Sequence, residues 1–193
     1  MRLRALLWSS CISVAMAVSA QPAAAAVTHE CVAGRPTAAS YTWNFQGEAN
    51  TIFKEVQSDA QEALYRADRL QSFTGTPELS WQTYGYQLNR LRGDINDIGA
   101  KLCRLETIRR AVAPWQQRVI DRIAVTTRLM ADNAQDAIVF GNTHSKELWL
   151  ATYRNYLNNL YNEGKSLTRS VGNAVEYSSV SKEYRDLRQS LGA

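Results

Sequence analysis

Few side chains in this 193-residue chain have types and spacings that suit chemistry. Asp94 and Asp97 lie three residues apart, which in a helix puts two carboxylates one turn apart, where they can bind a cation or exchange protons. His29 and His144 lie far from this pair, and neither belongs to the Glu-x-x-His motif of a di-iron bundle. No nucleophile–base pair and no glycine-rich phosphate loop is present. We therefore predict no catalytic residues and no cofactor, and interpret the two aspartates as part of a solvated helix face.

Basic residues gather in one part of the sequence. Seven lie between positions 101 and 128, opposed there by only two acidic residues: Lys101, Arg104, Arg109, Arg110, Arg118, Arg122 and Arg128. Arginines that end a helix complement its negative dipole end, but Arg118 and Arg122 lie early in the next helix. We predict that Arg109, Arg110, Arg118 and Arg122 form a binding surface for an acidic partner or anionic lipid headgroups. An ordinary solvated face is the alternative.

A second candidate binding surface is aromatic. Trp149, Tyr153 and Tyr156 form a line beside the apolar stripe of the last long helix, among several asparagines. Aromatic side chains with adaptable polar neighbours are typical of partner interfaces. Widening of the core by the same side chains is the alternative interpretation.

Four stretches place apolar residues at alternating steps of three and four, the spacing of one helix stripe. The clearest stripe consists of Tyr84, Leu88, Leu91, Ile95, Ile98, Leu102 and Leu105. No strand-like alternation competes with this pattern. The sequence therefore predicts an all-α, elongated up-down bundle with coiled-coil-like seams and four main helices. Helices are expected over residues 45–71, 77–112 and 114–141, with a fourth capped by Thr143 or Ser145.

Three boundaries decide this arrangement. The tripeptide 76–78, Thr-Pro-Glu, has the residue types that open a helix, and it should begin the second one. Pro114 disrupts a helix interior, so it marks either a corner between two helices or a kink within one. The apolar phase slips around Gly172 and Asn173, which predicts a break or a bend that leaves a short last helix.

Residues 1–26 have the pattern of an export signal. Arg2 and Arg4 precede an apolar run over 5–18 that is too short to span a bilayer, and small residues allow cleavage after Ala20 or Ala26. Without residues 1–26, 20 Lys and Arg remain against 18 Asp and Glu, a net charge of +2 rather than +4. We expect a periplasmic or secreted protein with no nucleic-acid partner, made of a leader over 27–42 and a bundle over 43–193.

Two cysteines follow the signal, and both fall at one end of an up-down bundle. Cys31 precedes the first helix and Cys103 lies toward the end of the second, so we predict that they form one disulfide, with two free thiols as the alternative. His29 is the one candidate metal ligand. If cleavage follows Ala26, the amino terminus, two amides and this third-position imidazole can enclose Cu²⁺ in a square plane.

These observations favour a non-catalytic binding or scaffolding protein of a bacterial-type cell envelope. Its expected partner is an envelope protein or an anionic membrane surface. A carrier of a small ligand or of copper is the alternative function, and an enzyme is third. The pattern leaves the oligomeric state open.

Overall fold

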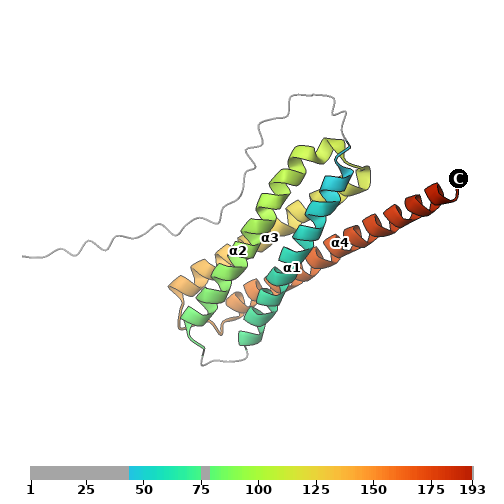
Figure 1. Ribbon diagram of the computed structural model, residues 1–193. Helices are drawn as coiled ribbons and strands as arrows, with labels where there is room; N and C mark the ends of the chain where they lie inside the picture. The colour runs from blue at the N-terminus through green and yellow to red at the C-terminus, as the bar shows by residue number, and fades with distance from the viewer. Residues whose placement is uncertain (1–43, 75–78, 193) are drawn as a thin grey trace, which may run out of the picture.

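The computed structural model describes residues 44–74 and 79–192, and this part of the chain is an all-α bundle of four long helices without strands (Figure 1). The elements are α1 (Gln46–Phe73), α2 (Trp81–Ile108), the short 3-10 helix η1 (Arg109–Ala111), α3 (Pro114–Thr143) and α4 (Ala151–Ser190). Each helix packs against two neighbours: α1 and α3 each contact both α2 and α4. The predicted all-α bundle is therefore confirmed.

The core lies along the predicted stripes. On α2, the six stripe residues Tyr84, Leu88, Leu91, Ile95, Ile98 and Leu105 are at most 3% exposed. The stripe of α1 is rich in alanine, with Ala60, Ala63 and Ala67 fully buried. Small side chains let α4 approach closely: a Cβ at Gly164 would lie 3.3 Å from the Cα of Leu64. Close packing of these backbones fixes the position of α4 against α1.

Pro114 forms a corner between two helices. α2 ends at Ile108, η1 follows, and Pro114 is the first residue of α3, where its missing N–H costs no hydrogen bond. The fully buried Gln116 holds this corner in place. Its Oε1 accepts a 2.9 Å hydrogen bond from the Ala113 amide, and its Nε2 donates to Gln46 O at 3.0 Å and to Asn50 Oδ1 at 2.8 Å. One side chain thus joins the start of α3 to the start of α1.

Two predicted helix starts were wrong. Leu79 and Ser80 are not helical, so α2 begins at Trp81, four residues later than predicted. The fourth helix was predicted to begin at Thr143 or Ser145. Instead α3 continues to Thr143, and α4 begins at Ala151. The Thr143 hydroxyl instead donates back to Val139 O at 3.0 Å, as a helix-interior threonine does.

The predicted break near Gly172 was also wrong. α4 is one helix of 40 residues that passes through Gly172 and Asn173 without interruption. A helix is held by local backbone hydrogen bonds, so a change in its apolar phase does not have to break it. The phase change instead marks where α4 leaves the other three helices (Figure 1). Residues 179–191 are almost entirely exposed, and there is no fifth helix in the described part of the chain.

Several predictions concern residues outside the described ranges. These are the export signal over 1–26, the leader over 27–42, His29 and Cys31. Cys103 lies on α2, half-buried, toward the end of the helix that packs near the start of α1. Within residues 44–74 and 79–192, no helix has the length and apolar character needed to cross a membrane.

Candidate binding surface

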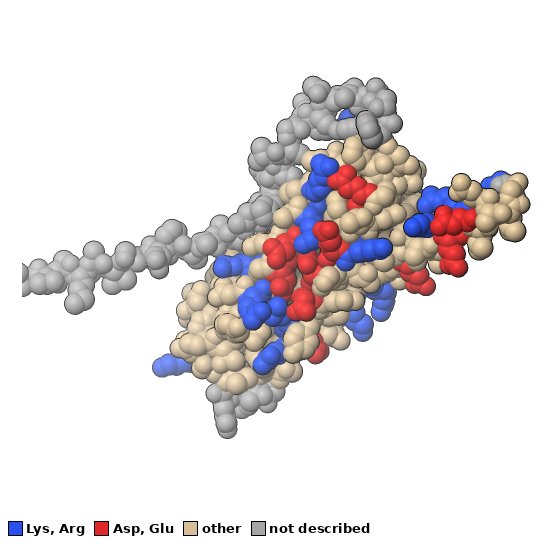
Figure 2. Space-filling view, viewed as in Figure 1, with Lys and Arg blue, Asp and Glu red and all other residues tan. Residues whose placement is uncertain are grey.

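Ion pairs between α1 and α2 account for two of the seven clustered basic residues. Figure 2 shows acidic and basic side chains gathered over these two helices. The three pairs are Arg66–Asp94 at 2.5 Å, Lys101–Asp59 at 2.6 Å and Arg104–Glu48 at 2.6 Å. Lys101 and Arg104 therefore hold α2 against α1, and their charge is balanced within the bundle.

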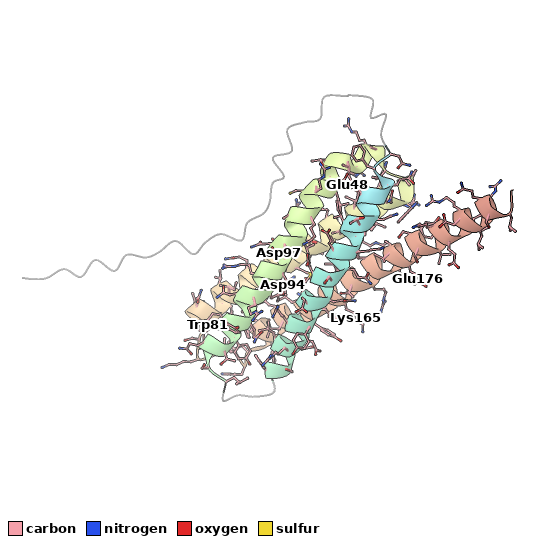
Figure 3. All side chains as sticks on the ribbon, in the orientation of Figure 1. Glu48, Trp81, Asp94, Asp97, Lys165 and Glu176 are labelled. Atoms are coloured by element: carbon pink, nitrogen blue, oxygen red, sulfur yellow. The ribbon has the colours of Figure 1, made fainter. Side chains whose placement is uncertain are left out.

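Asp94 does not belong to a solvated face, although Asp97 does. The Asp94 side chain is only 17% exposed and its partner Arg66 13%, while Asp97 is exposed one turn further along α2 (Figure 3). Burial raises the pKa of the Asp94 carboxyl, and the hydrogen bond from Arg66 opposes that rise. This carboxylate therefore has a structural partner. In the described part of the chain, no group of three or more His, Cys, Asp or Glu residues is arranged to hold a metal ion.

Arg109 is also held by an internal partner. Its guanidinium donates two parallel hydrogen bonds to Asp121, from Nε to Oδ1 at 2.9 Å and from Nη2 to Oδ2 at 2.8 Å. The hydrogen bond from Arg109 lowers the pKa of Asp121. This pair ties η1 to α3, so we assign Arg109 a structural role at the corner. Arg110 is exposed on η1.

Arg118 and Arg122 are exposed on α3 and have no ion-pair partner among the described residues. They border an open hollow of about 440 Å³ between α3 and α4, which we call the arginine–aromatic hollow. Its lining consists of Trp115, Arg118, Val119 and Arg122 from α3 and of Ser170, Asn173, Ala174 and Tyr177 from α4. The hollow thus combines two available guanidinium groups with aromatic and amide side chains.

Trp115 contributes a half-buried aromatic ring to this hollow. Its ring centroid lies 6.3 Å from that of the buried Phe53, which anchors it to the core. On the other side, the Tyr177 ring meets it edge-on, with centroids 4.9 Å apart and planes at 71°. Such edge-to-face geometry is the favoured arrangement of an aromatic pair. Tyr177 remains 54% exposed, so the pair presents aromatic surface to solvent.

The two arginines were predicted from the sequence, but Trp115, Asn173 and Tyr177 were not predicted to belong to the same site. Part of the signal was available, because Trp115, Arg118 and Arg122 recur at i, i+3 and i+7, the spacing of one helix face. The residues that α4 contributes to the hollow could not be predicted from the sequence, because they depend on which face of α4 packs beside α3.

The three residues of the predicted aromatic surface lie at the opposite end of the bundle. They do not form one exposed surface. Tyr153 is fully buried, with its ring 5.6 Å from Tyr84 and 5.7 Å from Phe140. Burial also raises the pKa of its hydroxyl. Tyr153 therefore belongs to the core, as the core-widening alternative expects. Tyr156 is half-buried, and Trp149, 67% exposed, lies in the α3–α4 connection.

The seven predicted surface residues therefore do not form one patch. Arg109, Arg110, Arg118 and Arg122 lie near the α2–α3 corner, whereas Trp149, Tyr153 and Tyr156 lie near the α3–α4 connection. No protein-family model, curated protein or solved structure matches this chain.

Proposed function

We propose that this chain is an exported, non-catalytic binding or scaffolding protein of a bacterial-type cell envelope, which binds an acidic protein segment at the arginine–aromatic hollow. The observation that supports this most strongly is that Arg118 and Arg122 line the same hollow as the Trp115–Tyr177 aromatic pair. Neither arginine has an ion-pair partner among the described residues. The export pattern of residues 1–26 supports the location.

The chemistry of the hollow suits a protein partner better than a lipid surface. Arginine offers a planar fork of donors that matches a carboxylate, and arginine with Trp and Tyr is the set enriched at binding hot spots. Ser170 and Asn173 add hydrogen-bonding groups on the α4 side. A membrane surface would need a broad basic face, whereas Lys101, Arg104 and Arg109 are already paired with carboxylates.

Reversing the charge of the hollow is expected to weaken partner binding. The double variant R118E/R122E should weaken association by a factor of about ten or more, because two attractive contacts become repulsive. Thermal stability should change little, since both side chains are exposed. The measurement is photo-crosslinking from a photoreactive residue placed at Asn173, in cells that export the chain, followed by affinity measurements with the trapped partner at increasing salt.

The matched control is R128E/R154E, which makes the same change in net charge at two exposed arginines outside the hollow. It should leave the crosslink and its salt dependence intact. An equal crosslink yield in R118E/R122E would contradict the proposal. The membrane alternative would be favoured instead if the parent protein gave no protein crosslink but bound vesicles that contain phosphatidylglycerol, and if R118E/R122E lost this vesicle binding.

We also propose the Cys31–Cys103 disulfide as part of this exported protein. The pair would close a long loop and tie the leader to α2, with a stabilisation of about 4 kcal/mol by chain-entropy reasoning. Mass spectrometry of non-reduced peptides from envelope-purified protein should show the linked pair. Alkylation of both thiols in that material without prior reduction would show that the bond is absent.

A further inference from the structure

The end of α4 extends beyond the bundle, and its side chains are almost all exposed. Ser178, 7% exposed, is the last buried residue of α4, and the helix continues to Ser190. We call residues 179–191 the α4 projection. Figure 1 shows it leaving the other three helices at an angle. Most helical stability in proteins comes from packing of an apolar face, so an unpacked helix end gains from a partner.

An apolar stripe begins at Tyr177 and continues along the projection. The stripe consists of Tyr177, Val180, Tyr184, Leu187 and Leu191, which are between 54% and 80% exposed. These residues follow one another at steps of three, four, three and four, the repeat of a coiled-coil seam. In heptad terms Tyr177, Tyr184 and Leu191 occupy a positions, and Val180 and Leu187 occupy d positions.

Tyr177, at the start of the stripe, still packs edge-on against Trp115. Beyond Tyr177 the stripe does not continue the face that α4 turns to its own bundle. The buried face ends with Val171, Ala174 and Ser178, and the same spacing next reaches Ser181 and Arg185, which are polar. The apolar residues have moved by one position, a rotation of about 100° around the helix. The sequence of the projection is therefore patterned to face something other than its own bundle.

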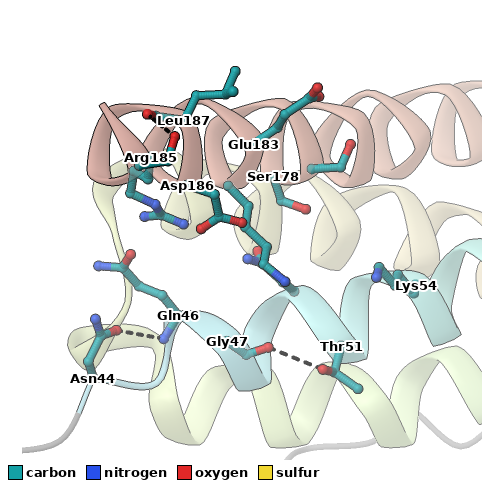
Figure 4. Close-up of a pocket in the computed structure, with 14 residues that line it drawn as sticks. Asn44, Gln46, Gly47, Thr51, Lys54, Ser178, Glu183, Arg185, Asp186 and Leu187 are labelled. Carbon is teal, nitrogen blue, oxygen red and sulfur yellow. Dashed lines mark hydrogen bonds between the residues drawn. The ribbon is translucent and has the colours of Figure 1, made fainter. Parts of the chain in front are cut away.

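The side toward α1 is an open polar groove. It has a volume of about 1100 Å³ and separates the start of α1 from the projection. Arg185 and Asp186 are directed into this gap, whereas the Leu187 side chain, at the border of the groove, lies on the outer side of α4 (Figure 4). The start of α1 thus leaves the apolar stripe uncovered.

The charges beside the stripe complement a second copy of the same helix. Six charged residues, Glu176, Lys182, Glu183, Arg185, Asp186 and Arg188, balance three acids against three bases. Balanced charge does not suit an anionic membrane. In the heptad frame Glu183 occupies a g position and Arg188 the e position five residues later. In a parallel two-stranded coiled coil, these are the positions that face each other across the seam.

We propose that two copies of this chain pair in parallel through the α4 projection, with Tyr177, Val180, Tyr184, Leu187 and Leu191 forming the seam. Symmetry gives two Glu183–Arg188 contacts, one on each side. An antiparallel pair would instead bring Glu183 of one copy close to Glu183 of the other, and two like charges repel each other. The parallel arrangement places two arginine–aromatic hollows at the same end of the dimer, next to Tyr177. This inference does not depend on what the hollow binds.

A seam of two heptads is short, so the dimer should be concentration-dependent. Stable interfaces usually bury roughly 1,200–2,000 Å², more than five stripe residues per copy provide. We expect sedimentation equilibrium of the full chain between 1 and 200 µM to fit a monomer–dimer equilibrium, these concentrations being about the range that resolves a micromolar Kd. L187E should shift the protein to monomer throughout this range. The control Q189E, which adds a charge at an exposed position outside the seam, should not.

Charge exchange tests the orientation. E183R and R188E each create two like-charge contacts in the parallel dimer and should raise its Kd by about tenfold. The double variant E183R/R188E restores opposite charges and should recover the parent Kd. A monomeric parent at 200 µM, association that survives L187E, or no recovery in the double variant would overturn the proposal. R118E/R122E changes no residue of the seam, so this variant should dimerise with the parent Kd. The test of the dimer is therefore separate from the test of binding at the hollow.

Discussion

Gly141→Ala is expected to lower the free energy of unfolding by about 1–3 kcal/mol, the usual cost of overpacking a buried site. Gly141 is buried in the last turn of α3, and a Cβ there would overlap three ring atoms of Trp81. Trp81 is the first residue of α2 and packs against the core, so its ring cannot move without disturbing the start of that helix. The missing side chain of Gly141 therefore creates the space that the indole fills.

Gly93→Ala is the matched control, because Gly93 lies exposed within α2 and a Cβ there meets nothing within 4 Å. Replacing a mid-helix glycine with alanine should raise the free energy of unfolding by up to about 1 kcal/mol. Urea denaturation of both variants beside the parent measures the two changes, and tryptophan fluorescence reports movement of the indole. Equal shifts in the two variants would show that helix propensity alone governs both sites.

Gly141 also shows where sequence reasoning stops. The pair Gly141-Asn142 has the residue types that end a helix, and the sequence analysis ended the third helix there. α3 does end nearby, at Thr143, but the glycine lies inside the helix and serves a contact with α2. Local composition located the end of the helix. The reason for the glycine is tertiary and depends on a residue 60 positions away.

The fold was largely predictable because apolar spacing is a local property. The steps of three and four identified the α2 stripe. The corner at Pro114 is one of the two alternatives, corner or kink, that the sequence left open. α4 was misread because the sequence shows a change of phase but not its consequence. A break and an uninterrupted helix that leaves the bundle produce the same pattern of residues.

The candidate site was predictable only in part, because charge pairing requires the three-dimensional arrangement. Composition alone could not separate Arg109, which Asp121 holds, from Arg118 and Arg122, which have no such partner among the described residues. Likewise Tyr153 was indistinguishable from an exposed aromatic residue until its neighbours on α2 and α3 were known. Helical periodicity identifies a face, but not whether that face is covered.

The stability of this protein should fall as pH rises from about 4.5 to 7, because of Glu163. This residue lies half-buried on α4, where its Oε1 accepts a 2.9 Å hydrogen bond from Asn133 Nδ2 on α3. Its buried Oε2 has no hydrogen-bond partner among the described residues. Burial raises the pKa of the Glu163 carboxyl to about 7, the Asp132 charge adds to this rise, and the Asn133 hydrogen bond opposes it.

The sign of the effect follows from proton binding. An unfolded glutamate has a pKa of about 4.3, so between that value and about 7 the folded state binds more protons than the unfolded state. Folding is then favoured at low pH, and the contribution is lost as pH rises through the folded pKa. Because the carboxyl is only half-buried, solvent screening reduces the full effect, and we expect a loss of roughly 1–2 kcal/mol by pH 8.

Glu163→Gln removes this charge while keeping an oxygen that can accept from Asn133. At pH 8 the variant should therefore be more stable than the parent by roughly 1–2 kcal/mol, and near pH 4.5 the two should be equal. Glu176→Gln is the control, since Glu176 is exposed on the same helix. Urea denaturation at several pH values from 4.5 to 8 gives the curves. If the parent and E163Q curves run parallel across this range, the Glu163 carboxyl does not titrate as its burial implies.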